Sequence, residues 1–187
     1  MAIPLIISTY CSAGCNHCPF NKSGVEIETF EIKDREIYII TGGEPLENIT
    51  HLKNIINQLQ FKNSYFRLAT GGYIRLSSIH SLLTNTANCL GINIGTDILL
   101  RNNSTYLQEI WFENWKLYGK LSNTWLTITL SYDIEFTIIE KLIQEMKPHK
   151  VLLNEIEGGF RDYIKYSNLL KLKFPFIKFI EGYRNET

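Results

Sequence analysis

The sequence predicts an α/β fold with a parallel sheet, because short β-rich runs alternate with longer amphipathic runs along the whole chain. Alternation of this kind indicates parallel strands joined by right-handed crossovers. A strand–helix–strand unit needs about 30 residues and a complete eight-unit barrel about 250. A chain of 187 residues therefore accommodates six units, as either an open doubly wound sheet or an incomplete, TIM-like (β/α)6 barrel.

Six strands are predicted where β-branched and aromatic residues gather, in chain order at residues 3–9, 36–41, 65–70, 90–95, 125–131 and 150–154. Amphipathic runs predict helices at residues 49–59, 76–83, 107–118, 135–146 and 163–172, each after one of the strands from the second onward. A further helix is expected within residues 25–33, after the first strand. The apolar run 174–180 is expected as a last strand or as a plug that closes the barrel, and residues 182–187 as a frayed tail.

Two of the predicted strands separate apolar side chains from small and polar ones. In residues 90–95 and 125–131 the strand period of two places the latter on one face. This small, polar set consists of Gly91, Asn93, Gly95, Thr127, Thr129 and Ser131. Barrel interiors filled for stability alone are dominated by bulky branched residues, so these faces indicate an interior left open for a ligand. The alternative is a face exposed to solvent at a sheet edge, which is common in antiparallel sheets.

Length and charge limit the classes of protein and partner. Residues 1–187 are expected to form a single domain, in which 174–187 is the closing strand or tail. Nineteen Lys and Arg residues balance nineteen Asp and Glu residues, which argues against a nucleic acid or an acidic membrane surface as partner. The chain has no apolar run of about 18 residues and no signal-peptide pattern at its start, so we expect a cytoplasmic protein.

Three of the four cysteines, Cys11, Cys15 and Cys18, lie within eight residues. In a cytosolic protein such clustering indicates metal binding rather than disulfides. Structural zinc takes four ligands, whereas Cys89 lies apart in an apolar strand and His17 lies too close in the chain to complete a tetrahedron comfortably. A four-iron cluster held by three thiolates leaves one iron open to a substrate or cofactor.

The cysteine spacing and a second motif together resemble the radical SAM superfamily. The matching residues are Cys11-x3-Cys15-x2-Cys18 after the first strand and Thr41-Gly42-Gly43-Glu44-Pro45 after the second. The resemblance implies the partial-barrel fold and a [4Fe-4S] cluster bound by the three cysteines, whose fourth iron is chelated by S-adenosylmethionine. It also implies that Gly42, Gly43, Glu44 and Pro45 line the site of the methionyl amino group.

Further cofactor contacts follow from the same resemblance. Residues 69–73 are similar to the family's frequent Thr-Asn-Gly turn, with Gly71 where the asparagine stands, and Thr96 and Asp97 fall where many members place a polar group. His17 occupies a position that is usually aromatic and lies near the adenine. The remaining contacts are assigned by position. The expected contacts are His17, Thr70, Asn93, Thr96, Asp97, Ser131 and Asn154; no catalytic residue is assigned.

The activity implied by the resemblance is reductive cleavage of S-adenosylmethionine, driven by an external electron donor such as flavodoxin or ferredoxin. The resulting 5′-deoxyadenosyl radical abstracts hydrogen from a small-molecule or peptide substrate. No further clustered cysteines are present for an auxiliary cluster. Two alternatives stay open: an activase that creates a glycyl radical on a larger partner enzyme, and a non-catalytic, metal-stabilised binding module.

Overall fold

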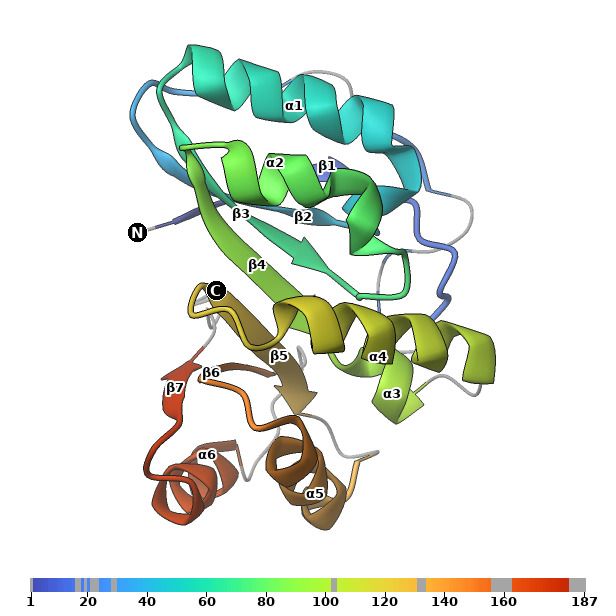
Figure 1. The fold of residues 1–187 in the computed structure, drawn as a ribbon, viewed down its shortest axis with the longest axis vertical. Coiled ribbons are helices and arrows are strands. Elements are labelled where there is room, and N and C mark those ends of the chain that lie inside the picture. The colour runs from blue at the N-terminus through green and yellow to red at the C-terminus, as the bar shows by residue number, and fades with distance from the viewer. Residues whose placement is uncertain are drawn as a thin grey trace.

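A computed structural model describes residues 2–15, 18, 20, 24–27, 30–101, 104–130, 134–155 and 163–181. Its seven strands form one parallel sheet (Figure 1). They are β1 (Ile3–Ser8), β2 (Ile37–Gly42), β3 (Tyr65–Thr70), β4 (Cys89–Gly95), β5 (Thr124–Leu130), β6 (Lys150–Glu155) and β7 (Lys178–Glu181). Strands adjacent in the chain are adjacent in the sheet. This order matches the incomplete barrel, because a doubly wound sheet reverses its strand order at a switch point.

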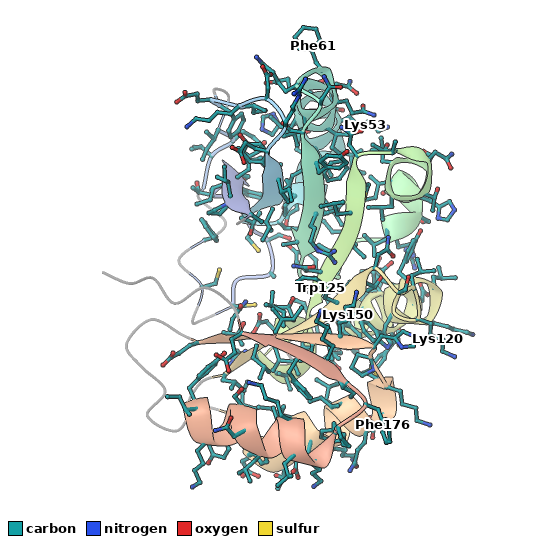
Figure 2. The ribbon with its side chains drawn as sticks, turned by 90° about the vertical axis from the view of Figure 1, so that its left-hand side faces the viewer. Lys53, Phe61, Lys120, Trp125, Lys150 and Phe176 are labelled. Carbon is teal, nitrogen blue, oxygen red and sulfur yellow. The ribbon has the colours of Figure 1, made fainter. Side chains whose placement is uncertain are left out.

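The helices cover the outer, convex side of the curved sheet (Figures 1 and 2). They are α1 (Ile49–Phe61), α2 (His80–Asn85), α3 (Asp97–Arg101), α4 (Thr105–Tyr118), α5 (Phe136–Met146) and α6 (Tyr163–Lys173), with 3-10 turns η1 (Pro45–Asn48) and η2 (Leu76–Ile79). Each crossover helix can pack back on its sheet in this way when the connections are right-handed. None of the helices formed by the described residues is long and apolar enough to cross a membrane.

The core lies between the convex face of the sheet and these helices. Ile40, Leu68 and Ile92 are buried and adjacent in register on three neighbouring strands. On the helix side, Trp111 and Trp115 of α4 stack with ring centroids 5.5 Å apart and are both buried. Burying a large apolar side chain stabilises a fold by roughly 1.5–3 kcal/mol. Packing of this layer leaves the concave face of the sheet for a ligand.

The predicted strands and the later helices are confirmed to within two residues, except that the helix expected at residues 76–83 divides into the 3-10 turn η2 and the helix α2. The apolar C-terminal run does add a strand, β7. The helix expected within residues 25–33 is wrong for the part of it that the structure describes. There the chain pairs antiparallel with β1 through a bridge between Ser8 and Glu26. The Ile27 N–H donates to the Ile7 carbonyl at 3.0 Å. Backbone groups at the open edge of β1 thus gain partners that a helix could not supply.

Candidate functional site

A cavity lies at the carboxyl ends of the strands and encloses about 720 Å³ of empty space, part of it open to solvent. Its walls come from the loop after β1 and from the ends of β2 to β6. The candidate residues that line it are Cys11, Cys15, Cys18, Gly42, Gly43, Glu44, Thr70, Asn93, Asp97 and Asn154. Most of the predicted site residues are therefore brought together in one cavity.

Two of the described candidate residues, Pro45 and Thr96, are not part of this lining. Pro45 is buried as the first residue of η1. Thr96 is fully buried, and its N–H donates to the Thr127 carbonyl at 3.0 Å, so it joins β4 to β5. His17 and Ser131 lie outside the described residues.

The cysteine loop turns sharply between β1 and the cavity. Gly14 has a φ of 63°, a conformation that favours glycine, and the Cys18 N–H donates to the Cys15 carbonyl at 3.0 Å. The pKa of the Cys15 thiol is raised to about 11, first by burial and then by the negative charges of Asp97, Cys11 and Cys18. Burial likewise raises the pKa of Cys18. A cationic centre would reverse these shifts by stabilising the thiolates.

The three cysteine side chains meet the donor requirement of an iron–sulfur cluster. Within the described part of the chain, no three His, Cys, Asp or Glu side chains are placed to hold one metal ion. In an iron–sulfur cluster each thiolate binds its own iron, so the sulfurs need not converge on one point. Three cysteine side chains that line a common cavity fit that requirement.

The Gly-Gly-Glu-Pro turn lies directly against the cysteine loop. The N–H groups of Gly43 and Glu44 donate to the carbonyls of Ser8 and Tyr10, at 2.7 and 2.9 Å. A Cβ atom at position 43 would lie 1.7 Å from the Tyr10 oxygen, so only glycine allows this approach. The second motif thus holds the backbone that precedes Cys11.

Glu44 is a buried carboxylate with a full set of hydrogen-bond donors. Its oxygens accept from the Thr70 hydroxyl at 2.9 Å, the Gly71 N–H at 2.8 Å and the Leu46 N–H at 3.1 Å. Burial raises the pKa of Glu44 to about 7, against the opposing effect of these bonds. The residue lines the cavity, where a cationic group would stabilise its ionised form.

Asp97 lies on the other side of the cavity, at the start of α3. It forms an ion pair with Arg101, one helical turn along. A second guanidinium nitrogen of Arg101 donates to the Thr129 carbonyl at 2.9 Å, which ties α3 to the end of β5. The ion pair fixes the position of a carboxylate at the mouth of the barrel.

The predicted small and polar faces do line the interior. Asn93, Gly95, Thr127 and Thr129 all border the cavity, which confirms that these strand faces border an open interior. Gly91 does not border it and instead packs against the backbone of Asn123.

No family model matches the sequence, and no curated protein matches it. Solved structures do match the fold. The fold is similar to that of SuiB. The Streptococcus suis SuiB structure bound to S-adenosylmethionine superposes with a TM-score of 0.71 at 11% identity, covering 98% of this chain and 51% of that chain. A second Streptococcus suis SuiB structure superposes with a TM-score of 0.71 at 11% identity, covering 98% of this chain and 50% of that chain. The SuiB structure bound to precursor peptide SuiA superposes with a TM-score of 0.66 at 11% identity, covering 98% of this chain and 49% of that chain.

This chain therefore spans about half the length of the SuiB chains that it matches. The likeness to SuiB extends to the fold, and the chemistry of the cavity is argued from the side chains of this chain. Sequence reasoning assigned no role to Glu47, Tyr73 or Arg101, which contact the cysteine loop, Cys11 and Asp97, respectively. The contacts of Glu47 and Tyr73 depend on loop geometry, which residue spacing does not reveal, and that of Arg101 depends on the short helix α3.

Proposed function

We propose that this chain is a radical SAM enzyme that modifies a peptide substrate. In this proposal Cys11, Cys15 and Cys18 hold a [4Fe-4S] cluster, and S-adenosylmethionine occupies the cavity beside Gly42–Pro45. The observation that carries the proposal is that the cysteine loop and the Gly-Gly-Glu turn line one cavity and bond to each other. The likeness of the fold to SuiB, solved with S-adenosylmethionine and with a precursor peptide, supports the cofactor and the peptide class.

When bound, the reduced cluster and S-adenosylmethionine supply a carbon-centred radical for hydrogen abstraction, with electrons from a donor such as flavodoxin or ferredoxin. The protein's own residues bind and orient the cofactor and the substrate. Glu44 offers a carboxylate to the amino group of the cofactor, and Thr70 holds that carboxylate in place. Asn93, Asp97 and Asn154 provide polar contacts around the rest of the cofactor. Roles for His17, Thr96, Pro45 and Ser131 remain predictions.

The small side chains of the interior leave room for the substrate. Gly95, Thr127 and Thr129 border the cavity from β4 and β5. A reactive carbon must be held in contact with its target and shielded from other hydrogen donors. Parallel strands form one wall of the cavity, and part of the cavity is open to solvent. A peptide would enter through this open side and exclude water from the cavity.

The deciding experiment is anaerobic reconstitution with iron and sulfide, followed by reduction in the presence of S-adenosylmethionine. We expect brown protein with about four irons and four sulfides, and formation of 5′-deoxyadenosine. Cys15→Ala should abolish both. Cys89→Ala is the matched control, because Cys89 opens β4 and does not line the cavity, and it should retain both. Colourless protein that binds zinc, or full cluster loading of Cys15→Ala, would contradict the proposal.

A further inference from the structure

The concave face of the sheet carries positive charge below the cavity. Arg67 of β3, Lys150 of β6 and Lys178 of β7 all occupy inward positions. Because side chains alternate along a strand, Arg67 lies on the same face as Ala69, and Lys150 on the same face as Asn154. Ala69 and Asn154 both line the cavity, and Lys178 lies beside Lys150 in register. Within the described part of the chain, none of the three cations has an ion-pair partner.

Arg67 is the most unusual of the three, because its side chain is buried and only 8% of the residue is exposed. Its guanidinium donates to the carbonyls of Leu90, Ile92 and Asn123 and, through Nε at 3.0 Å, to Asn93 Oδ1. Burial lowers the pKa of Arg67 to about 10. Arginine is rarely buried without an opposite charge, since carbonyl dipoles do not neutralise it.

Trp125 of β5 joins two of these cations. The Arg67 guanidinium carbon lies 3.9 Å from the indole centroid, and the Lys150 ammonium lies 6.0 Å from it. Figure 2 shows Trp125 and Lys150 near each other, in agreement with this distance. The indole N–H of Trp125 and the hydroxyl of Thr127, the next inward residue on β5, are buried and have no hydrogen-bond partner among the described residues. Buried donors without an acceptor are costly, by about 1–3 kcal/mol each.

No carboxylate on the inner face of the described strands neutralises these positive charges. The strands contain two acidic residues, Glu155 and Glu181, and both lie on the outer face, beside the buried residues Leu130 and Leu153. Two residues further along β6 and β7 from Lys150 and Lys178, Leu152 and Ile180 are inward neighbours in register and only partly buried. The interior thus combines unpaired cations, unpaired donors and accessible apolar surface.

We propose that this interior binds an acidic side chain of the peptide substrate, flanked by apolar side chains. The proposal rests on the proposed function and adds the substrate class. A carboxylate would pair with Arg67 and Lys150 and give the Trp125 N–H an acceptor, while Leu152 and Ile180 contact apolar neighbours. Asn93 connects this subsite to the cavity above, because it borders the cavity and accepts from Arg67. Cations spread over three strands with apolar residues beside them suit an amphipathic segment better than a single small anion.

The test is calorimetric titration of the cluster-loaded protein, in the presence of S-adenosylmethionine, with a short capped peptide of alternating leucine and glutamate. Matched peptides carry glutamine or lysine in place of glutamate. We expect the glutamate peptide to bind about tenfold more tightly than the glutamine peptide. Lys150→Gln should remove most of this preference, and Trp125→Phe, which keeps an aromatic face and deletes the indole N–H, should reduce it severalfold. Lys53→Gln, on the exposed outer side of α1 (Figure 2), should leave it unchanged.

Equal binding of the glutamate and glutamine peptides, absence of binding, or an unchanged preference in Lys150→Gln would overturn the proposal. Displacement of the glutamate peptide by inorganic phosphate at equal concentration would also overturn it, because the site would then suit any small anion. Failure of the proposed function gives a different result. If reconstituted protein holds no cluster and forms no 5′-deoxyadenosine, the proposed radical SAM activity is refuted. Binding of the same two peptides to cluster-free protein would still test the acidic subsite.

Discussion

The phenol of Tyr73 lies 3.3 Å from the sulfur of Cys11 and donates a 2.5 Å hydrogen bond to a carboxylate oxygen of Glu47. The same Glu47 oxygen accepts from the Ser12 N–H at 2.7 Å. Tyr73 is 5% exposed, and burial raises the pKa of its phenol well above the ordinary value, so the group keeps its proton. The turn after β3 is thereby fastened to the cysteine loop.

Tyr73→Phe is expected to loosen the cluster without preventing its assembly. The substitution keeps the buried ring and removes the hydrogen bond that steadies Glu47 against Ser12. Losing one such bond costs about 1 kcal/mol, which corresponds to about fivefold faster loss of iron to a chelator. The measurement is the rate of iron release from reconstituted protein of equal initial loading.

Tyr38→Phe is the matched control for that experiment. Tyr38 is also buried, and its phenol oxygen accepts from the Lys33 N–H at 2.9 Å, away from the cysteines. It should lower the free energy of unfolding by a similar amount and leave the rate of iron release unchanged. Equal acceleration in both variants would mean that Tyr73 acts only through general stability.

Binding of S-adenosylmethionine to the cluster-loaded protein is expected to strengthen as pH rises from 6 to 8. The pKa of Glu44 is raised to about 7, so at pH 6 the carboxyl is mostly neutral and offers little attraction to an amino group. One pH unit below the pKa, roughly a tenth of the groups are ionised, so the affinity should fall by about tenfold. Glu44→Gln should bind more weakly at pH 8 and with little dependence on pH. A similar pH dependence in Glu44→Gln would assign it to another group.

The same shift predicts how stability depends on pH. Glu44 has a higher pKa in the folded protein than its ordinary value of 4.5, so between about 4.5 and 7 the folded state binds a proton that the unfolded state has released. Its contribution therefore makes the folded state less stable as pH rises through this window. Comparing urea denaturation of the wild type and Glu44→Gln at the two ends of the window isolates this contribution.

The fold was largely predictable because each strand and each later helix has its own apolar period. The failure in residues 25–33 shows the limit of local pattern: that segment pairs with the edge of β1, a contact set by the sheet rather than by its own sequence. The helix α3, Asp97–Arg101, was missed because five residues are too few to show a helical period. The sequence therefore predicts elements that pack by themselves and misses those that depend on a neighbour.

The site residues also divide into those that a local sequence pattern predicts and those that depend on a neighbouring element. Cysteine spacing and the Gly-Gly-Glu turn carry short-range signals, and their residues do meet in one cavity. Nothing in the sequence singles out Arg67, because its guanidinium reaches Asn93 and Trp125 only when β3, β4 and β5 are adjacent. Contacts between residues distant in sequence require the register of the sheet, which no single strand encodes.

Asn114 of α4 holds the loop that carries Tyr73, and its replacement by alanine is expected to destabilise the protein and release iron faster. Its amide donates to the carbonyls of Gly72 and Ile74, each at 2.8 Å, and its oxygen accepts from the Leu76 N–H at 3.0 Å. Asn114 is 2% exposed, so the substitution leaves buried groups unpaired and should lower the free energy of unfolding by about 2–3 kcal/mol in urea denaturation. Asn114→Asp keeps the acceptor and loses the donors, and it should be destabilising as well. A loss below about 0.5 kcal/mol with unchanged iron release would show that the loop keeps its conformation without this clamp.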